Sequence, residues 1–167
     1  MLSMSDTLPN RQDAVNSDEA AARTSGGDAL SEFVVHVFRL DGMLKTAGDA
    51  LAEPAGQTSA RWRVLAALDY GPMTVAQIAR AWWLARQSVQ RVADLLERDG
   101  LVTYEQNPAH RRAQLVRLTP RGRAALTRIR AAQREWANTL GDRIGTDDLR
   151  TANQILARVI EALTDAA

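Results

Sequence analysis

The sequence contains no cysteine, and this absence removes several kinds of site at once. Disulfide bridges, thiolate metal sites and cysteine-based redox switches are all excluded. Histidine is scarce as well, and His36 and His110 fall on separate predicted elements, so we expect no metal site and no cofactor. A chain without cysteine is typical of the cytoplasm, which is the location that we expect.

Long apolar runs are also missing. Because no run of about eighteen consecutive apolar residues occurs, we expect no helix that spans a membrane. The first residues lack a basic segment followed by an apolar segment, so no signal peptide is expected. The sequence shows no Ser-His-Asp order, paired carboxylates, glycine-rich phosphate loop or metal cluster, and we therefore expect no enzymatic activity.

Lysine is represented by Lys45 alone, so arginine carries nearly all of the positive charge. The formal net charge of +1 predicts no partner, but the charge is unevenly distributed. Residues 57–127 contain eleven arginines and five acids, whereas residues 1–56 are net acidic. Genomic base composition explains the excess of arginine over lysine, but it does not explain the clustering. A local basic field is typical of a surface that binds a polyanion.

The N-terminal third is predicted to contain an arm and a long helix. Residues 1–27 are polar and lack apolar periodicity, which is typical of a flexible arm. Apolar residues then recur at alternating steps of four and three, which predicts a helix over residues 28–53. Pro54 and Gly56 are expected to end this helix.

The last helix carries a similar apolar stripe. It is predicted to be capped by Thr146, Asp147 and Asp148, with Leu149 as its first apolar contact residue. A single chain would leave part of these two apolar stripes exposed to water. We therefore expect a homodimer in which residues 28–56 and 120–167 pack across a two-fold axis; these stripe residues are Phe33, Val37, Leu40, Leu44, Ala47, Leu51, Leu149, Ala152, Leu156, Val159 and Leu163.

Three shorter helices are predicted in the basic middle of the chain. The first covers residues 58–70. The second covers Thr74–Leu84, where Thr74 and Gln77 form a capping-box pattern. The third covers Ala85–Asp99 and is followed by Gly100 as its C′ residue. The apolar residues of the second helix share one face, which we expect to point inward; they are Val75, Ile78, Ala79, Trp82 and Trp83.

A basic hairpin is predicted after these helices. Residues 101–106 and 114–118 have strand patterns, and they are joined by a polar tip. Thr119 followed by Pro120 then predicts the start of a helix that runs to about residue 140. The expected fold class is mainly α with a small β-hairpin wing.

The helix over residues 86–98 exposes a polar patch on its first two turns. In a recognition helix these turns meet the base edges of DNA. Arginine can pair bidentately with guanine and glutamine with adenine, and Ser88 suits a phosphate oxygen. Ala85 occupies the N-cap position, where serine or threonine would be favoured. A solvated surface face is the simpler interpretation of this patch alone, but the adjacent hairpin favours DNA; the patch contains Arg86, Gln87, Gln90 and Arg91.

The tip of the hairpin carries Arg111 and Arg112, flanked by Asn107 and His110. Arginines on a projecting loop can enter the minor groove of DNA. Two charges on a solvated turn are the simpler alternative. We expect one arginine to reach DNA and the other to brace the loop, and the sequence leaves open which does which.

Taken together and in order, these motifs resemble those of the MarR family of transcription regulators, over roughly residues 30–165. The residues that carry the resemblance are Thr74–Ala79, Arg86–Arg91, Leu95–Val102, the tip Asn107–Arg112, and Leu118–Gly122.

The resemblance implies a dimeric winged helix-turn-helix repressor or activator that binds a pseudo-palindromic operator, and we expect a repressor. Residues 57–119 would be the DNA-binding region. Arg112 would be the arginine of the family's wing motif, in which His110 replaces an acid, so Arg112 would either be unpaired or pair with Asp94 or Asp99. The expected DNA-binding residues are Thr74, Gln77, Arg86, Gln87, Ser88, Gln90, Arg91, His110, Arg111 and Arg112.

The resemblance also implies control by a small aromatic effector bound between the dimerisation and DNA-binding parts. Tryptophans in a structural core are the simpler interpretation for each residue alone. The candidate lining is His36, Arg39, Met43, Trp62 and Trp82, with Phe38 and Trp83 beside them.

A winged-helix module that binds protein instead of DNA is the second function class. Such a module would not need a polar recognition face next to an arginine tip, so we rank it below DNA binding.

Overall fold

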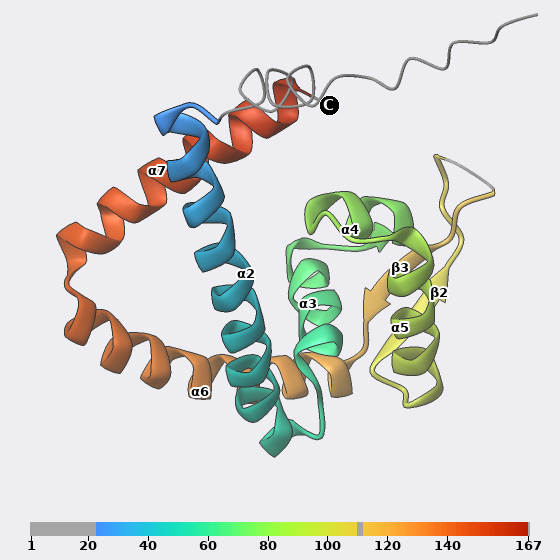
Figure 1. Ribbon diagram of the computed structural model, residues 1–167. Helices are drawn as coiled ribbons and strands as arrows, with labels where there is room; N and C mark the ends of the chain where they lie inside the picture. The colour runs from blue at the N-terminus through green and yellow to red at the C-terminus, as the bar shows by residue number, and fades with distance from the viewer. Residues whose placement is uncertain (1–22, 110–111, 167) are drawn as a thin grey trace, which may run out of the picture. The chain divides into compact units, whose positions relative to one another are not determined.

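The computed structural model describes residues 23–109 and 112–166, and these residues form two compact units that divide between Leu44 and Lys45. The predicted fold class is confirmed, because helices dominate and a small sheet forms the wing (Figure 1). The elements are α2 (Ser25–Ala52), the 3₁₀ helix η1 (Glu53–Ala55), α3 (Ser59–Ala67), the 3₁₀ helix η2 (Leu68–Tyr70), β1 (Met73–Thr74), α4 (Val75–Ala81), α5 (Arg86–Arg98), β2 (Val102–Glu105), β3 (Leu115–Leu118), α6 (Pro120–Ile144) and α7 (Thr146–Asp165).

Helix α2 begins at Ser25, so the predicted arm over residues 1–27 is too long at its C-terminal end. The reason is a cap. The hydroxyl of Thr24 accepts a hydrogen bond from the backbone N–H of Gly27 at 3.1 Å, which starts the helix before the apolar stripe does. Residues 1–22 of the predicted arm lie outside the described residues. The predicted end is confirmed, because Gly56 follows η1 with a left-handed φ of 68°.

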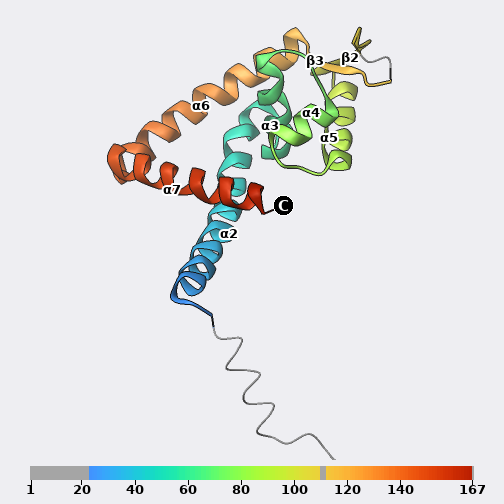
Figure 2. The ribbon, with the colours of Figure 1, turned by 90° about the horizontal axis from the view of Figure 1, so that it is seen from above.

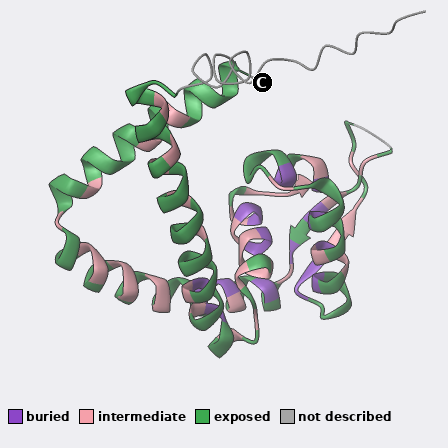
Figure 3. Cartoon of the chain, viewed as in Figure 1, coloured by how far each residue is buried: buried purple, intermediate pink, exposed green. Residues whose placement is uncertain are grey.

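The core of the second unit lies between α3, α4, α5, the sheet and the start of α6, where the buried residues gather in Figure 3. Each element contributes the apolar residues of one face, as the helical and strand periods require. The largest fully buried side chains are Leu65, Ile78, Leu96, Leu126, Ile129, Val64, Val89, Val102 and Val116.

The sheet has three antiparallel strands in the order β1-β3-β2. The predicted hairpin is confirmed, and Figures 1 and 2 show β2 and β3 side by side, next to α5. Strand β1 is not predicted by the sequence because two residues are too short to show an alternating pattern. It forms because Met73 pairs with Val116, and Thr74 pairs with Leu115, in the antiparallel strand β3.

Helix α4 ends at Ala81, three residues before its predicted end, and Trp82 and Trp83 do not point inward as predicted. Trp83 has a left-handed φ of 49°. The N–H of Leu84 bonds to the carbonyl of Ala79 at 2.9 Å, and the N–H of Trp83 bonds to that of Arg80 at 3.2 Å. This is the Schellman pattern with tryptophan where glycine is usual, and it turns both indoles outward, with Trp83 78% exposed.

The C-terminal helices also differ from prediction. Helix α6 begins after the predicted Thr119 cap, but it continues through Gly141 to Ile144. A glycine inside a helix costs about 1 kcal/mol, which a long helix tolerates. Gly145, with a φ of 97°, makes the break, so Thr146 is the first residue of α7 and not its cap.

Candidate nucleic-acid interface

Helix α5 is strongly amphipathic. Val89, Ala93 and Leu96 are at most 1% exposed and fix one side of the helix to the core. The opposite side is therefore held outward. The structure places all the predicted recognition residues of this helix in exposed positions on its first two turns; these are Arg86, Gln87, Ser88, Gln90 and Arg91.

The N-terminus of α5 has no side-chain cap, as the sequence predicts from Ala85. The carbonyl of Ala85 accepts the N–H groups of Ser88 and Val89. Within the described chain, the N–H groups of Arg86 and Gln87 have no acceptor. Free N–H groups at the start of a helix, beside the positive end of its dipole, suit a phosphate oxygen.

Thr74 and Gln77 form the predicted capping box at the start of α4. The N–H of Thr74 donates to Oε1 of Gln77 at 2.8 Å, and the N–H of Gln77 donates to Oγ1 of Thr74 at 3.2 Å. The cap therefore occupies the acceptor atoms of both side chains. The amide nitrogen of Gln77, which is exposed, is the group left for a phosphate.

Arg112 is exposed and lies near the recognition helix. A hollow of about 150 Å³ is lined by residues from α4, α5 and the wing, including Thr74, Arg86, Gln90, Tyr104 and Arg112. The start of α4, the start of α5 and the described part of the wing therefore meet around one depression. His110 and Arg111, the other predicted residues of the tip, lie outside the described residues.

Arg112 pairs with neither of the acids that the sequence offers. Asp99 forms an ion pair with Arg61, whose guanidinium lowers the pKa of that carboxyl. Asp94 accepts hydrogen bonds from Gln90 and Tyr104. Among residues 23–109 and 112–166, no carboxylate lies within ion-pair distance of Arg112 or Arg86. Two unpaired guanidinium groups beside one hollow make a site that favours an anion.

One contact between the wing and the recognition helix is not predicted by the sequence. The hydroxyl of Tyr104 on β2 donates to Oδ1 of Asp94 on α5 at 2.7 Å. Burial, and then the hydrogen bond to Asp94, raise the pKa of the Tyr104 phenol, so its hydroxyl stays protonated. No periodic signal links a strand residue to a helix residue ten positions earlier, so only the tertiary structure shows this contact.

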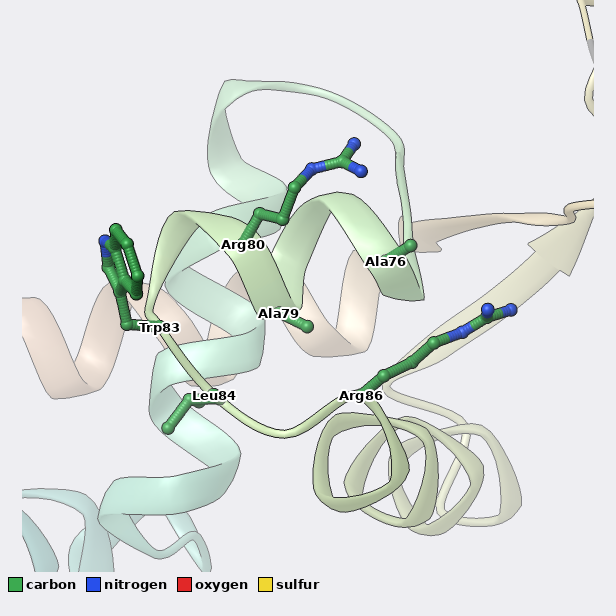
Figure 4. Close-up of a pocket in the computed structure, with 6 residues that line it drawn as sticks. All are labelled: Ala76, Ala79, Arg80, Trp83, Leu84 and Arg86. Atoms are coloured by element: carbon green, nitrogen blue, oxygen red, sulfur yellow. The ribbon is translucent and has the colours of Figure 1, made fainter. Parts of the chain in front are cut away.

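An open pocket of about 560 Å³ lies at the turn between α4 and α5. Figure 4 shows the indole of Trp83 at one side, Ala79 on α4, Leu84 in the turn, and the side chains of Arg80 and Arg86 pointing in different directions away from the indole. The pocket combines an apolar surface with two cations. Such a lining matches the usual character of small-molecule sites, which are mostly apolar with a few polar groups.

The residues predicted to bind an effector fall in both units. His36, Arg39 and Met43 lie on α2 within the N-terminal unit, and Trp62 and Trp82 lie in the second unit. The predicted pocket that would join them stays a prediction. Trp62 packs against the core, whereas Trp82 is 45% exposed. Of the tryptophans predicted for this role, Trp83 is the one that lines the open pocket of Figure 4.

Two features are absent from the described residues. No group of three or more His, Cys, Asp or Glu side chains in this part of the chain could hold a metal ion. None of the helices described is both long and apolar enough to cross a membrane.

Comparison with known proteins identifies relatives over most of the chain. Residues 55–113 match the MarR family. An uncharacterised protein of Mycobacterium tuberculosis is 37% identical over 136 residues, which cover 81% of this chain and 95% of that protein. The transcriptional activatory protein BadR of Rhodopseudomonas palustris is 30% identical over 148 residues, which cover 81% of this chain and 83% of BadR.

The fold is similar to that of solved regulators. The regulator MosR of M. tuberculosis, in a crystal structure with DNA, superposes with a TM-score of 0.65 at 23% identity, covering 80% of this chain and 96% of MosR.

Proposed function

Because the chain belongs to the MarR family of transcription regulators, we propose that it binds double-stranded DNA sequence-specifically, as a homodimer on a pseudo-palindromic operator. The observation that carries the proposal is the hollow shared by Thr74, Arg86, Gln90 and Arg112. The exposed first turns of α5 would enter a major groove, and the wing would contact the backbone or the neighbouring minor groove.

The charge and the free backbone donors support this proposal. Arg86 and Arg112 face the solvent without an acidic partner in the described chain, so a phosphate can approach them without displacing a carboxylate. The uncapped start of α5 adds the N–H groups of Arg86 and Gln87. A winged-helix module that binds protein would have no use for this arrangement, and MosR, which shares the fold, was solved with DNA.

Exposed apolar side chains support the homodimer. Helix α7 contains no buried residue, and three of its large apolar side chains, Ile155, Ile160 and Leu163, are between 44% and 65% exposed. The predicted stripe residues Leu149, Leu156 and Val159 on the same helix are half-buried. Helix α2 likewise exposes Phe38 and Met43 at about 70%. Apolar patches of this kind mark interaction surfaces. A second copy would cover them and would place two recognition helices for two half-sites.

We propose repression as the mode of control and no enzymatic activity. A dimer that fills two successive major grooves excludes other proteins from that stretch of DNA. BadR, the relative from R. palustris, is named an activatory protein. Whether this chain lowers or raises transcription is therefore measured directly with a reporter gene placed behind the selected operator. Higher expression with the regulator present than without it would show activation and would contradict the proposed repression.

The test of DNA binding is a selection from a randomised duplex library at a stated salt concentration. We expect recovery of an inverted repeat whose half-sites lie about one helical turn apart. The affinity for this repeat should exceed that for unrelated DNA by at least about a thousandfold. Equal affinity for all sequences would contradict sequence-specific regulation.

Replacing Arg112 by alanine should weaken binding to all DNA sequences alike, by about three- to tenfold, and should reduce the slope of log affinity against log salt by about one. The reason is the loss of one phosphate contact. Fluorescence anisotropy at several salt concentrations measures both quantities. The matched control is Arg150→Ala on α7, whose guanidinium is paired with Asp147 at 3.1 Å and should not contribute. Equal slopes for the two variants would refute the role of Arg112.

We further propose that the pocket at the turn between α4 and α5 binds a small aromatic carboxylate. Trp83 supplies a flat apolar surface, and Arg80 and Arg86 supply cations for the carboxylate. Trp83 is the one non-glycine residue with positive φ in the described chain, a conformation that costs about 1–2 kcal/mol. Strain of this kind often marks a functional position. Because Arg86 is also a proposed DNA contact, an occupied pocket would compete with DNA.

Salicylate is a suitable probe of this pocket. We expect it to bind in calorimetry and to release the labelled operator, and we expect Arg80→Ala and Trp83→Ala to weaken both effects at least about tenfold. Neither residue is a proposed DNA contact, so operator affinity without salicylate should persist. Arg123→Ala on α6 is the control. Release of DNA that is unaffected by both variants would place the effector elsewhere.

A further inference from the structure

Gln90 is held by two acceptor oxygens that lie close together. Its amide nitrogen Nε2 is 2.8 Å from Oδ1 of Asp94, one helical turn later on α5, and 2.9 Å from the hydroxyl oxygen of Tyr104 on β2. These two oxygens are 2.7 Å apart. The three atoms close a nearly equilateral ring of hydrogen bonds that joins the recognition helix to the wing.

The ring determines which end of the Gln90 amide faces Asp94. An ionised carboxylate only accepts hydrogen bonds, so the single hydroxyl proton of Tyr104 goes to Asp94 and the phenolic oxygen accepts from Gln90. Both neighbours of the amide are therefore acceptors. Turning the amide over would place Oε1 against two oxygens that offer it no proton, so only the nitrogen can face them.

One proton of the Gln90 amide is enough for the ring. Seen from Nε2, the two acceptor oxygens lie in similar directions, whereas the two N–H bonds of an amide diverge widely. A single N–H can therefore point between them as a three-centre bond. It is the N–H beside Cγ, because the other N–H runs alongside Oε1 and would carry that oxygen toward the two acceptors. Gln90 is exposed, and within the described chain Oε1 and the N–H beside it have no partner.

We propose that Gln90 is a specificity-determining residue for adenine and that Asp94 is the positioning residue that fixes the orientation of its amide. The inference rests on the proposed DNA binding. The free edge of the amide carries one acceptor and one donor side by side, which match the N6 donor and the N7 acceptor of adenine. Tyr104 donates to Asp94 and so holds the carboxylate in place.

The fixed orientation also excludes guanine. Guanine shows two acceptors in the major groove, N7 and O6. An amide that is free to turn could offer both of its protons to them. Gln90 cannot do so, because the ring uses one proton, and Oε1 would then face an acceptor and leave both oxygens unsatisfied. Asp94 should therefore add a discrimination against guanine that glutamine alone does not have.

Selections from one randomised duplex library test which base Gln90 reads. Gln90→Ala should remove the base preference at one position of each half-site, and Gln87→Ala, the control on the same helix, should leave that position unchanged. There we expect the unaltered protein to bind adenine at least about tenfold more tightly than guanine. A preference for guanine, or equal binding of adenine and cytosine, which an amide with both protons engaged would give, would overturn the inference.

Asp94→Ala tests the positioning role. Without the carboxylate, the hydroxyl of Tyr104 can either donate to Oε1 or accept from Nε2, so the amide of Gln90 is free to turn. The preference for adenine over guanine should then fall at least about fivefold. Glu97→Ala is the matched control, because it removes an exposed carboxylate of the same helix that lies outside the ring. An unchanged preference in a folded Asp94→Ala protein would overturn the inference.

Tyr104→Phe separates the orientation of the amide from general damage to the contact between helix and wing. This change removes the hydroxyl but leaves Asp94, which still accepts from Nε2 and cannot donate. The preference for adenine over guanine should therefore stay within about threefold of that of the unaltered protein, whatever the change in overall affinity. A loss of preference as large as that of Asp94→Ala would show that both changes only disturb the fold, and would overturn the inference.

A measurement on the free, unaltered protein removes the dependence on a folded variant. In ¹⁵N-edited NMR spectra the two side-chain amide protons of Gln90 give separate signals. The proton beside Cγ should exchange with water at least about tenfold more slowly than the proton beside Oε1. Equal exchange rates of the two protons would overturn the inference. Failure of the library to yield any preferred sequence would instead overturn the proposed function, and the inference with it.

Discussion

Gly122→Ala should destabilise the protein by about 3 kcal/mol or more, at the upper end of what overpacking costs. A Cβ atom at Gly122 would lie 2.0 Å from the carbonyl oxygen of Leu101 and 3.2 Å from Cδ2 of Leu118. The carbonyl group of Leu101 cannot easily move away from this Cβ atom, because its oxygen accepts a hydrogen bond from the N–H of Thr119 at 3.1 Å. The start of α6 is thus held directly against the hairpin.

Thermal unfolding measures this loss. For a chain of this size, 3 kcal/mol corresponds to a fall in Tm of roughly 6–12 °C. Gly141→Ala on the same helix is the matched control, because a Cβ atom there would meet no atom of the described residues within 4 Å. That change should raise stability by up to about 1 kcal/mol through helix propensity. Equal effects of the two substitutions would show that the contact with Leu101 does not constrain Gly122.

Ile160→Glu combined with Leu163→Glu should convert the protein to a monomer and reduce operator affinity by about a hundredfold or more. The two side chains are 58% and 65% exposed within one chain, so charging them should cost a single protomer little stability. In a dimer they would be covered, and buried unpaired carboxylates would oppose association. Losing the second half-site then removes the advantage of bivalent binding.

Sedimentation velocity and anisotropy measure these two consequences, and circular dichroism confirms folding. Glu161→Lys is the control, because Glu161 lies away from Ile155, Ile160 and Leu163 on α7 by the helical period and is exposed. This variant should remain dimeric and keep most of its operator affinity. A double variant that sediments as a dimer and binds the operator normally would remove α7 from the proposed interface.

The parts of the fold that were predicted well depend on neighbours along the chain. The capping box of Thr74 and Gln77, the Thr119 cap of α6 and the C′ glycine after α5 all form as the sequence indicates. Their atoms lie within a few residues of one another, so the local sequence carries the whole interaction. The exposed face of α5 followed equally from the helical period, because burial of Val89 and Leu96 orients the remaining side chains.

The predicted helix boundaries were wrong where two local sequence signals conflicted. The apolar pattern extended α4 to Leu84, but the Schellman turn at Trp83 ended the helix earlier and exposed both tryptophans. Threonine is a favoured N-cap residue, yet Gly145 takes the non-helical N-cap conformation and Thr146 is the first residue of the helix. Periodicity predicts which residues share a face, but it does not determine where the backbone leaves the helix.

The sequence by itself therefore determined the order of the elements, the exposed basic face of α5 and the family to which the chain belongs. Only the tertiary structure decided the pairing of β1 with β3, the close approach of Gly122 to Leu101, and the ring that holds Gln90. Each of these joins residues separated by ten or more positions along the chain, or strands too short to show a pattern. Such contacts depend on how the helices and the sheet pack in three dimensions, which no local periodicity encodes.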